Sequence, residues 1–137
     1  MNMIIDCMTF NGENAILKLH LSILGDYVDK FIIVEANKTF TGLPKPYYLI
    51  RDYRYFKPWW NKIDHYMMDD WDDVGLWQRA LDSPNTKGAE HWKREWYVKE
   101  SIHKALKRAK IKDNDTLFLG DVDEIIDPHA HFESKTP

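Results

Sequence analysis

Two aspartates separated by one residue are the clearest chemical signal in this sequence. Asp121 and Asp123 follow directly on the apolar run 116–119 and a glycine. A buried strand that ends in two carboxylates presents two hard oxygen ligands at the carboxyl edge of a sheet. Such ligands suit Mn²⁺ or Mg²⁺, which bridge the oxygens of a diphosphate. The alternative is a solvated acidic turn ahead of Pro128, because Asp-x-Asp also occurs by chance.

Three further charged residues could contact a nucleotide. Glu35 ends the apolar run 30–34, where a carboxylate could accept hydrogen bonds from a ribose or a base. Arg94 and Lys99 stand in a basic segment shortly before the Asp-x-Asp run, where they could face phosphate. The alternatives are an ordinary strand-ending acid for Glu35 and a solvated basic helix face for the other two.

Aromatic residues are unusually abundant. They make up 14% of the chain and include six tryptophans and seven tyrosines. Some of these rings could stack on sugar or base rings, while several must belong to the core. The single cysteine, Cys7, lies in an apolar run and is expected in the core, and no intramolecular disulfide is possible.

The elements that must position these residues follow from hydrophobic periodicity. The segment 3–35 shows an apolar run, a stretch with helical spacing and a second apolar run, which predicts a βαβ unit. A third strand is expected near 63–67, a helix over 90–110 and a strand over 115–119. We expect the strands near 3–7, 31–35 and 115–119 to be neighbours in one mostly parallel sheet. The stretch 69–90 is expected to be a long, poorly ordered loop.

Composition excludes several classes of protein. The 137 residues correspond to one domain, 1–137, and the net charge of −3 comes from 19 basic and 22 acidic residues. This balance gives no overall attraction to nucleic acid or to an anionic membrane. No apolar run is long enough to span a bilayer, so a cytoplasmic protein is expected. Glycine-rich dinucleotide, P-loop and esterase motifs are absent from the sequence.

Taken in order, several blocks resemble glycosyltransferase family 17, which contains the β-1,4-mannosyl-glycoprotein 4-β-N-acetylglucosaminyltransferases. The resemblance spans residue 3 to about residue 126. Its most specific parts are Val34-Glu35-Ala36-Asn37-Lys38-Thr39-Phe40-Thr41-Gly42 and Asp121-Val122-Asp123-Glu124-Ile125, joined by Phe10-Asn11-Gly12-Glu13, Lys45-Pro46 and Trp92-x-Arg94-Glu95.

The resemblance implies an α/β fold of the GT-A type, with a Rossmann-like, mostly parallel sheet flanked by helices. It also implies UDP-N-acetylglucosamine as donor, a glycan as acceptor, and Mn²⁺ or Mg²⁺ held through the Asp-x-Asp. The implied roles fall on eight residues. They are the metal and diphosphate contacts Asp121, Val122 and Asp123, the nucleotide-side contacts Glu35 and Asn37, the first-loop residues Phe10 and Asn11, and Arg94 at the helix start.

The chain departs from this family in two respects. After Arg94-Glu95 the family tends toward a histidine and an Arg-Asn pair, whereas Trp96, Lys99 and Glu100 stand here. In addition, the chain ends at Pro137, and the family continues well past its Asp-x-Asp to supply acceptor contacts and a catalytic base. We therefore expect only the nucleotide-binding half, truncated after the motif.

Three matters stay open at this point. Glu124 and Asp127 lie near the motif but have no special claim to act as the base. A non-catalytic nucleotide-sugar-binding remnant is one alternative function. A haloacid-dehalogenase-like phosphatase is another, although its motif usually lies near the N-terminus and has a Thr or Val where Ile125 stands. The sequence gives no oligomeric state.

Overall fold

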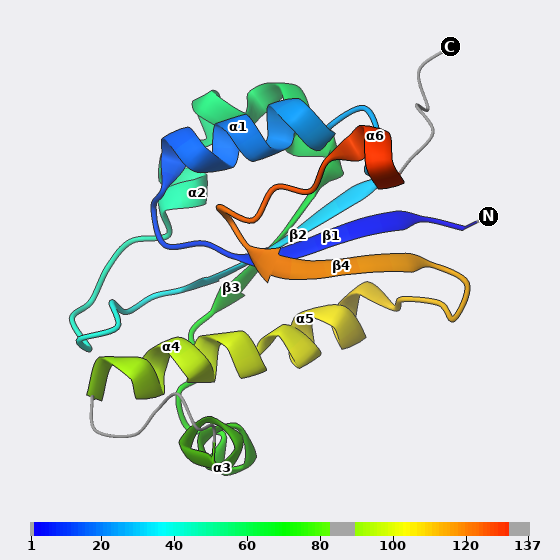
Figure 1. Cartoon of the computed structure of the whole chain (residues 1–137). Coiled ribbons are helices and arrows are strands. Elements are labelled where there is room, and N and C mark those ends of the chain that lie inside the picture. Colours follow the sequence, from blue (N-terminus) through cyan, green and yellow to red (C-terminus); the bar gives the residue numbers. More distant parts are fainter. Residues whose placement is uncertain (1, 83–89, 132–137) are drawn as a thin grey trace.

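A computed structural model describes residues 2–82 and 90–131 and shows a parallel sheet covered by helices on both faces (Figure 1). The strands are β1 (Ile4–Thr9), β2 (Lys30–Ala36), β3 (Ile63–Met68) and β4 (Thr116–Asp121), in the spatial order β3-β2-β1-β4. The helices are α1 (Asn14–Leu24), α2 (Tyr48–Arg51), the 3-10 helix η1 (Tyr53–Lys62), α3 (Val74–Asp82), α4 (Glu90–Glu100), α5 (Ile102–Ala109) and α6 (Pro128–His131). The predicted α/β, Rossmann-like fold is confirmed.

Strand register brings the ends of three strands to one edge. In β1, Thr9 is paired with Val34 of β2 on one side and with Asp121 of β4 on the other. All pairs are parallel, so the carboxyl ends of β1, β2 and β4 open on the same side. The predicted sheet of neighbouring strands is therefore confirmed. Since β2 and β4 flank β1 on opposite sides, this edge is a point where the strand order reverses, which is where such sheets bind ligands.

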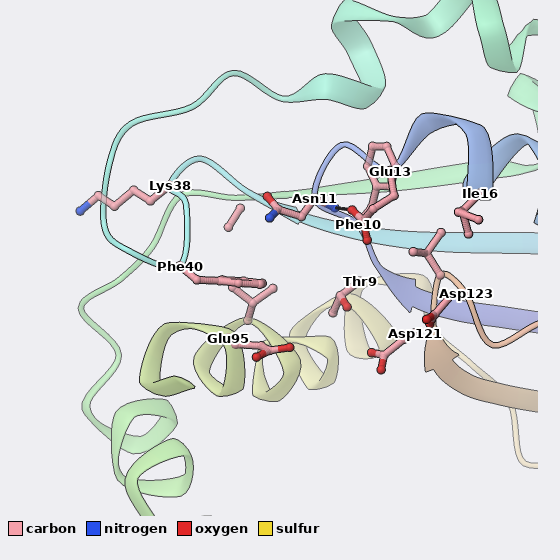
Figure 2. A pocket seen from close by; sticks show the side chains of 13 residues that line it. Thr9, Phe10, Asn11, Glu13, Ile16, Lys38, Phe40, Glu95, Asp121 and Asp123 are labelled. Carbon is pink, nitrogen blue, oxygen red and sulfur yellow. Dashed lines mark hydrogen bonds between the residues drawn. The ribbon is translucent and has the colours of Figure 1, made fainter. Parts of the chain in front are cut away.

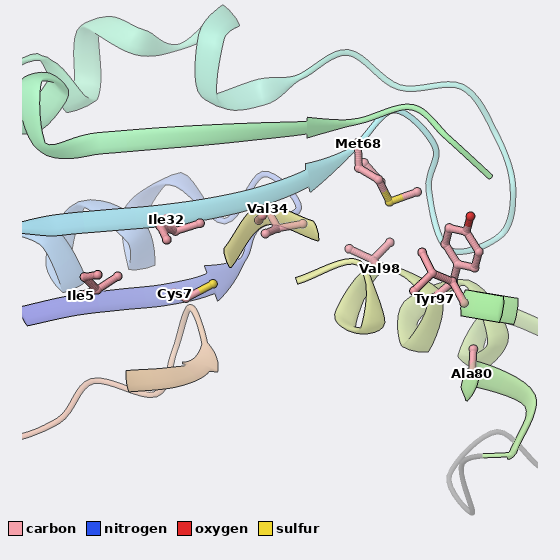
Figure 3. Close-up of a cluster of buried hydrophobic side chains, with 11 residues drawn as sticks. Ile5, Cys7, Ile32, Val34, Met68, Ala80, Tyr97 and Val98 are labelled. Carbon is pink, nitrogen blue, oxygen red and sulfur yellow. The ribbon is translucent and has the colours of Figure 1, made fainter. Parts of the chain in front are cut away.

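Alternation along β2 builds a core on each face of the sheet. Phe31 and Ile33 are fully buried in a cluster with α1, α2 and η1. Their neighbours Ile32 and Val34 point to the other face, where they pack toward α4 and α5 (Figure 3). Successive side chains of a strand point to opposite faces, and the continuous apolar run of β2 is what a strand covered on both faces requires.

The prediction of a long loop over 69–90 is wrong for its middle part. Residues Val74–Asp82 form α3, and the backbone N–H of Leu76 donates to Asp73 Oδ1 at 3.1 Å, which satisfies a free donor at the helix start. Leu76 and Ala80, one helical turn apart, are buried in the core on the sheet face that α4 and α5 cover. Residues 83–89 lie outside the described part of the chain, so that part of the expectation is not tested.

A compact group of aromatic rings attaches α3 to α4. Tyr97 of α4 stacks on Trp71 with ring centroids 5.2 Å apart and lies 4.3 Å from Trp77 of α3. The Tyr97 hydroxyl donates to the carbonyl of Asp70 at 2.9 Å.

The predicted helix over 90–110 is present as two segments, α4 and α5, which meet at the buried Ser101. Within the described ranges, no helix combines the length and the apolar character needed to cross a membrane.

Candidate functional site

A cavity of about 400 Å³ opens at the carboxyl edge of the sheet (Figure 2). Its wall comes from the ends of β1, β2 and β4, from the loop after β2 and from α4. The lining residues are Thr9, Phe10, Asn11, Glu13, Ile16, Ala36, Lys38, Phe40, Glu95, Val98, Asp121, Val122 and Asp123. The cavity therefore unites the first-loop residues with the Asp-x-Asp segment, which lie more than a hundred positions apart in the chain.

The segment 121–123 presents two acids to this cavity and buries the residue between them. Asp121 ends β4 and keeps its side chain 47% exposed, while Asp123 follows in the turn and is exposed. Val122 is only 3% exposed and packs into the core beside α1. The Asp121 N–H donates to Glu124 Oε1 at 2.8 Å, and the Glu124 N–H returns a bond to the Asp121 carbonyl. This local turn fixes the backbone that bears both acids.

Lys99 supplies the positive charge beside these acids. Its Nζ lies 3.7 Å from Asp121 Oδ1 and 3.8 Å from Glu95 Oε1, and 4.7 Å above the ring of Trp96. The ammonium thus lies between a carboxylate of β4 and a carboxylate of α4. An anion entering the cavity would find in Lys99 a cation held close to its wall.

Asp121 and Asp123 suit a metal ion whose remaining coordination positions are filled by a bound ligand. Among residues with described side chains, no group of three or more His, Cys, Asp or Glu could hold a metal ion by itself. Asp121 and Asp123 offer two hard oxygen donors on one cavity wall. Mg²⁺ and Mn²⁺ accept one or two carboxylates when substrate phosphates complete their coordination. The donor set therefore fits a cation bound together with a diphosphate.

Arg94 has a position different from the predicted phosphate contact. Its guanidinium donates to the carbonyl of Phe40 at 3.3 Å and packs under Gly42. A Cβ on Gly42 would come within 2.8 Å of Arg94 Nη2, and the φ of +91° there suits glycine. Arg94 is absent from the cavity lining. It supports the loop that places Phe40 against the cavity.

The sequence matches the profile of glycosyltransferase family 17 over residues 1–132. The chain belongs to this family. Its members are glycosyltransferases, so the cavity is to be understood in terms of a sugar donor and an acceptor. Searches among curated proteins and among solved structures gave no significant match.

In this glycosyltransferase, Glu35 is used inside the fold rather than in the cavity. Its carboxylate is fully buried and accepts hydrogen bonds from Lys45 Nζ at 2.9 Å, from the Tyr48 N–H at 2.6 Å and from the Leu49 N–H at 3.2 Å, and His65 Nε2 lies 3.0 Å away. Burial raises the pKa of Glu35, but the bonds from His65 and Lys45 outweigh it and leave the pKa below its ordinary value. Glu35 is absent from the cavity lining, and its predicted contact with the nucleotide stays a prediction.

The remaining predicted residues divide between the cavity and the fold. Phe10 and Asn11 line the cavity, and the Asn11 N–H donates to Glu13 Oε1 at 2.6 Å, which shapes the first loop (Figure 2). Asn37 instead accepts a bond from Trp71 Nε1 at 2.9 Å. Its side chain thereby anchors the end of β2 to the aromatic group of α3 and α4.

The aromatic rings of the cavity are phenylalanines, whereas the abundance of tryptophan and tyrosine was the aromatic signal in the sequence. Phe10 and Phe40 line it, and no tryptophan with a described side chain does. Phe40 and Glu95 stand in the blocks that resemble the family, so the resemblance contained the signal for both. Nothing in their local sequence distinguished them from other loop and helix residues. Roles for the lining residues in binding stay predictions.

Proposed function

We propose that this glycosyltransferase transfers N-acetylglucosamine from UDP-N-acetylglucosamine to a sugar acceptor, with inversion and with Mn²⁺ or Mg²⁺. The observation that supports this most directly is the cavity wall that carries Asp121 and Asp123, with the Lys99 ammonium 3.7 Å from Asp121 Oδ1 behind it. Two carboxylates and one ammonium group at the carboxyl edge of a parallel sheet form a site for a metal-bound diphosphate. Family membership makes a nucleotide-sugar the natural source of that diphosphate.

Each part of the donor would have its own contacts. Asp121 and Asp123 would hold the cation, whose positive charge stabilises the departing diphosphate. Lys99 adds a second positive charge close to Asp121. Phe40 offers apolar ring surface for the nucleoside or the sugar, while Phe10, which is 3% exposed, closes the wall behind it. Asn11 contributes an amide at the same wall for hydrogen bonding to the donor.

The transfer itself requires an acceptor hydroxyl on the face of the sugar opposite the diphosphate. Its oxygen forms a bond to the anomeric carbon as the bond from that carbon to the diphosphate oxygen breaks, and the hydroxyl proton leaves to a base. Glu124 and Asp127 are absent from the cavity lining, so the structure gives neither of them a special claim to this task. We assign no base. A cytoplasmic location stays a prediction from sequence.

Calorimetry with UDP tests the site. The parent should bind UDP at least roughly tenfold more tightly with Mn²⁺ than without it, equivalent to about 1.4 kcal/mol. Asp123→Ala should remove this difference, because one of two metal ligands is lost. Its free energy of unfolding should change little, since an exposed acid with no partner in the core is removed.

Asp113→Ala is the matched control, because Asp113 is an exposed aspartate in the turn before β4, at the opposite end of the strand. It should keep the parent's dependence on Mn²⁺. A parent that binds UDP equally with and without Mn²⁺ would contradict the proposed metal site. Sugar release or transfer assayed with the same proteins separates an enzyme from a module that only binds, and phosphatase activity without sugar transfer would point to the dehalogenase-like alternative.

A further inference from the structure

A buried histidine connects the first strand to the segment 121–123. His20 of α1 is 1% exposed, and its Nε2 lies 2.5 Å from Asp6 Oδ2 of β1. Its Nδ1 lies 2.8 Å from the carbonyl oxygen of Val122. Phe31 meets the imidazole edge-on, with ring centroids 6.4 Å apart. One side chain thus joins α1, β1 and the residue between the two cavity acids.

The partners of His20 determine where its protons lie. A carbonyl oxygen can only accept, so Nδ1 must carry a hydrogen and donate it to Val122. The Asp6 carboxylate is likewise an acceptor for Nε2. The ring therefore donates from both nitrogens, as an imidazolium facing a carboxylate. Burial by itself would lower the pKa of His20, but the bond and charge of Asp6 and the bond to Val122 raise it overall.

The bond to Val122 acts on the central peptide of the turn 121–124, which has no pairing in the sheet and whose own hydrogen bonds involve only Asp121 and Glu124. Asp121 is fixed by its pairing in β4, whereas Asp123 lies beyond the end of that strand. The Val122 carbonyl belongs to the peptide that leads into Asp123. With the Val122 side chain in the core and its carbonyl on His20, this peptide can take only one orientation.

A buried ion pair is a costly way to fill a core. Replacing such a pair with apolar side chains often leaves a protein equally stable or more stable, because the desolvation cost disappears. The pair Asp6–His20 lies beside the apolar cluster of Leu17, Leu21 and Val122, where apolar replacements would pack readily. The value of the pair to the protein should therefore lie in the hydrogen bond from His20 Nδ1 to the Val122 carbonyl.

We propose that His20, oriented by Asp6, is a positioning residue that sets the direction of the Asp123 carboxylate through the Val122 carbonyl. This inference rests on the proposed function for the use of that carboxylate, but its structural part is independent of it. His20 touches no substrate in this role. It fixes the peptide from which a metal ligand projects, which is the support that a binding site needs from its surroundings.

Two substitutions separate the two ends of His20. In His20→Asn the amide nitrogen stands as far along the side chain as Nδ1, so it can still donate to Val122 but cannot reach Asp6. In His20→Gln the amide stands at the level of Nε2, so it reaches Asp6 and leaves Val122 without a donor. Both variants remove the charge and leave a small void, but His20→Asn also leaves the buried Asp6 carboxylate without its donor, so it should be the less stable of the two.

The positioning role predicts a difference between these variants in Mn²⁺-dependent UDP binding. His20→Gln should weaken it by roughly tenfold or more, while His20→Asn stays within about threefold of the parent. The second readout needs no ligand: the carbonyl ¹³C shift of Val122 and the amide ¹⁵N shift of Asp123 should stay near the parent values in His20→Asn and move in His20→Gln. Equal losses in both variants, or unchanged shifts in both, would overturn the proposal.

The outcomes for the two proposals are distinguishable. If the parent binds UDP without regard to Mn²⁺, the proposed function fails, and the Val122 and Asp123 shifts still decide whether His20 positions the segment. If neither variant folds, the parent suffices, because ¹⁵N spectra of its imidazole at neutral pH should show hydrogens on both ring nitrogens and a bond from Nδ1 to the Val122 carbonyl. An Nδ1 without a hydrogen would overturn the proposal.

Discussion

Two acids that look alike in the sequence have opposite surroundings in the fold. Glu35 and Asp121 each end an apolar strand, but Glu35 is fully buried and Asp121 is close to half exposed. The difference comes from Lys45 and His65, which lie 10 and 30 positions away from Glu35 and surround its carboxylate. Periodicity in one strand holds no information about such partners, so this part of the site could not be predicted.

Neutralising Glu35 should therefore harm the fold rather than the cavity. Glu35→Gln leaves the Lys45 ammonium buried without its counter-charge, and we expect a loss of about 3 kcal/mol in the free energy of unfolding. Urea denaturation measures this loss, and calorimetry on the remaining folded protein should show UDP affinity like that of the parent. Glu100→Gln is a suitable control, since its partner Arg79 is exposed and the expected loss is about 1 kcal/mol or less. A stable Glu35→Gln with weakened UDP binding would restore the nucleotide contact.

His20 should make stability depend on pH. Its pKa in the folded protein is raised above the ordinary value of 6.5, so its stabilising contribution is complete below that value. The contribution is lost as the pH rises through the folded pKa. The groups facing the imidazole are the Asp6 carboxylate of β1, the Val122 carbonyl and the Phe31 ring. The difference in unfolding free energy between the parent and His20→Gln should thus be largest in mild acid and should shrink on the alkaline side. A difference that grows with pH would contradict this assignment.

At the scale of elements, the strands were predictable and the connections were less so. Apolar runs bounded by turn residues identify β1, β2 and β4, and the parallel order follows from the helix between the first two. The helix α3 was missed because the acidic run before it and Gly75 within it both favour a loop. The cap by Asp73 and the pair Leu76 and Ala80 were the available signals, and they gain their meaning from the core they meet.

The loop after β2 depends on Gly42. Gly42→Ala places a methyl group against the Arg94 guanidinium at a positive φ, so we expect a loss of about 1–3 kcal/mol in stability. Because this loop places Phe40 against the cavity, UDP binding should weaken as well. Gly75→Ala is the matched control: its φ is not positive, and the better helix propensity of alanine is offset by a Cβ that would lie 3.3 Å from Asp73 Oδ1, so stability should change by less than about 1 kcal/mol. Urea denaturation measures the stability and calorimetry measures the UDP affinity. A Gly42→Ala variant with the parent's stability and UDP affinity would show that the loop accommodates the methyl group without moving Phe40.

On the scale of the whole molecule, one sheet joins both cores. Phe31 and Ile32 are neighbours in β2, both fully buried, and they enter different clusters. Phe31→Ala and Ile32→Ala should each lower the free energy of unfolding by about 3–4 kcal/mol. Because each cluster is anchored on the same strands, each variant should unfold in one transition. Far-UV circular dichroism and NMR signals from both faces should coincide along a urea titration, and separate midpoints for the two faces would contradict this coupling.

The group of rings between α3 and α4 has an optical consequence. Tyr97 lies within 4.3–5.2 Å of Trp77 and Trp71, so light absorbed by this tyrosine passes to the indoles before it can be emitted. The indole of Trp77 also donates to the carbonyl of Trp71, which keeps the two rings together. A movement of α3 away from α4 would carry Trp77 away from Tyr97, whereas Trp71 precedes α3, so the surroundings and the emission of the Trp77 indole would change. In a variant whose other five tryptophans are replaced by phenylalanine, Trp77 would therefore report the docking of α3 without an added label.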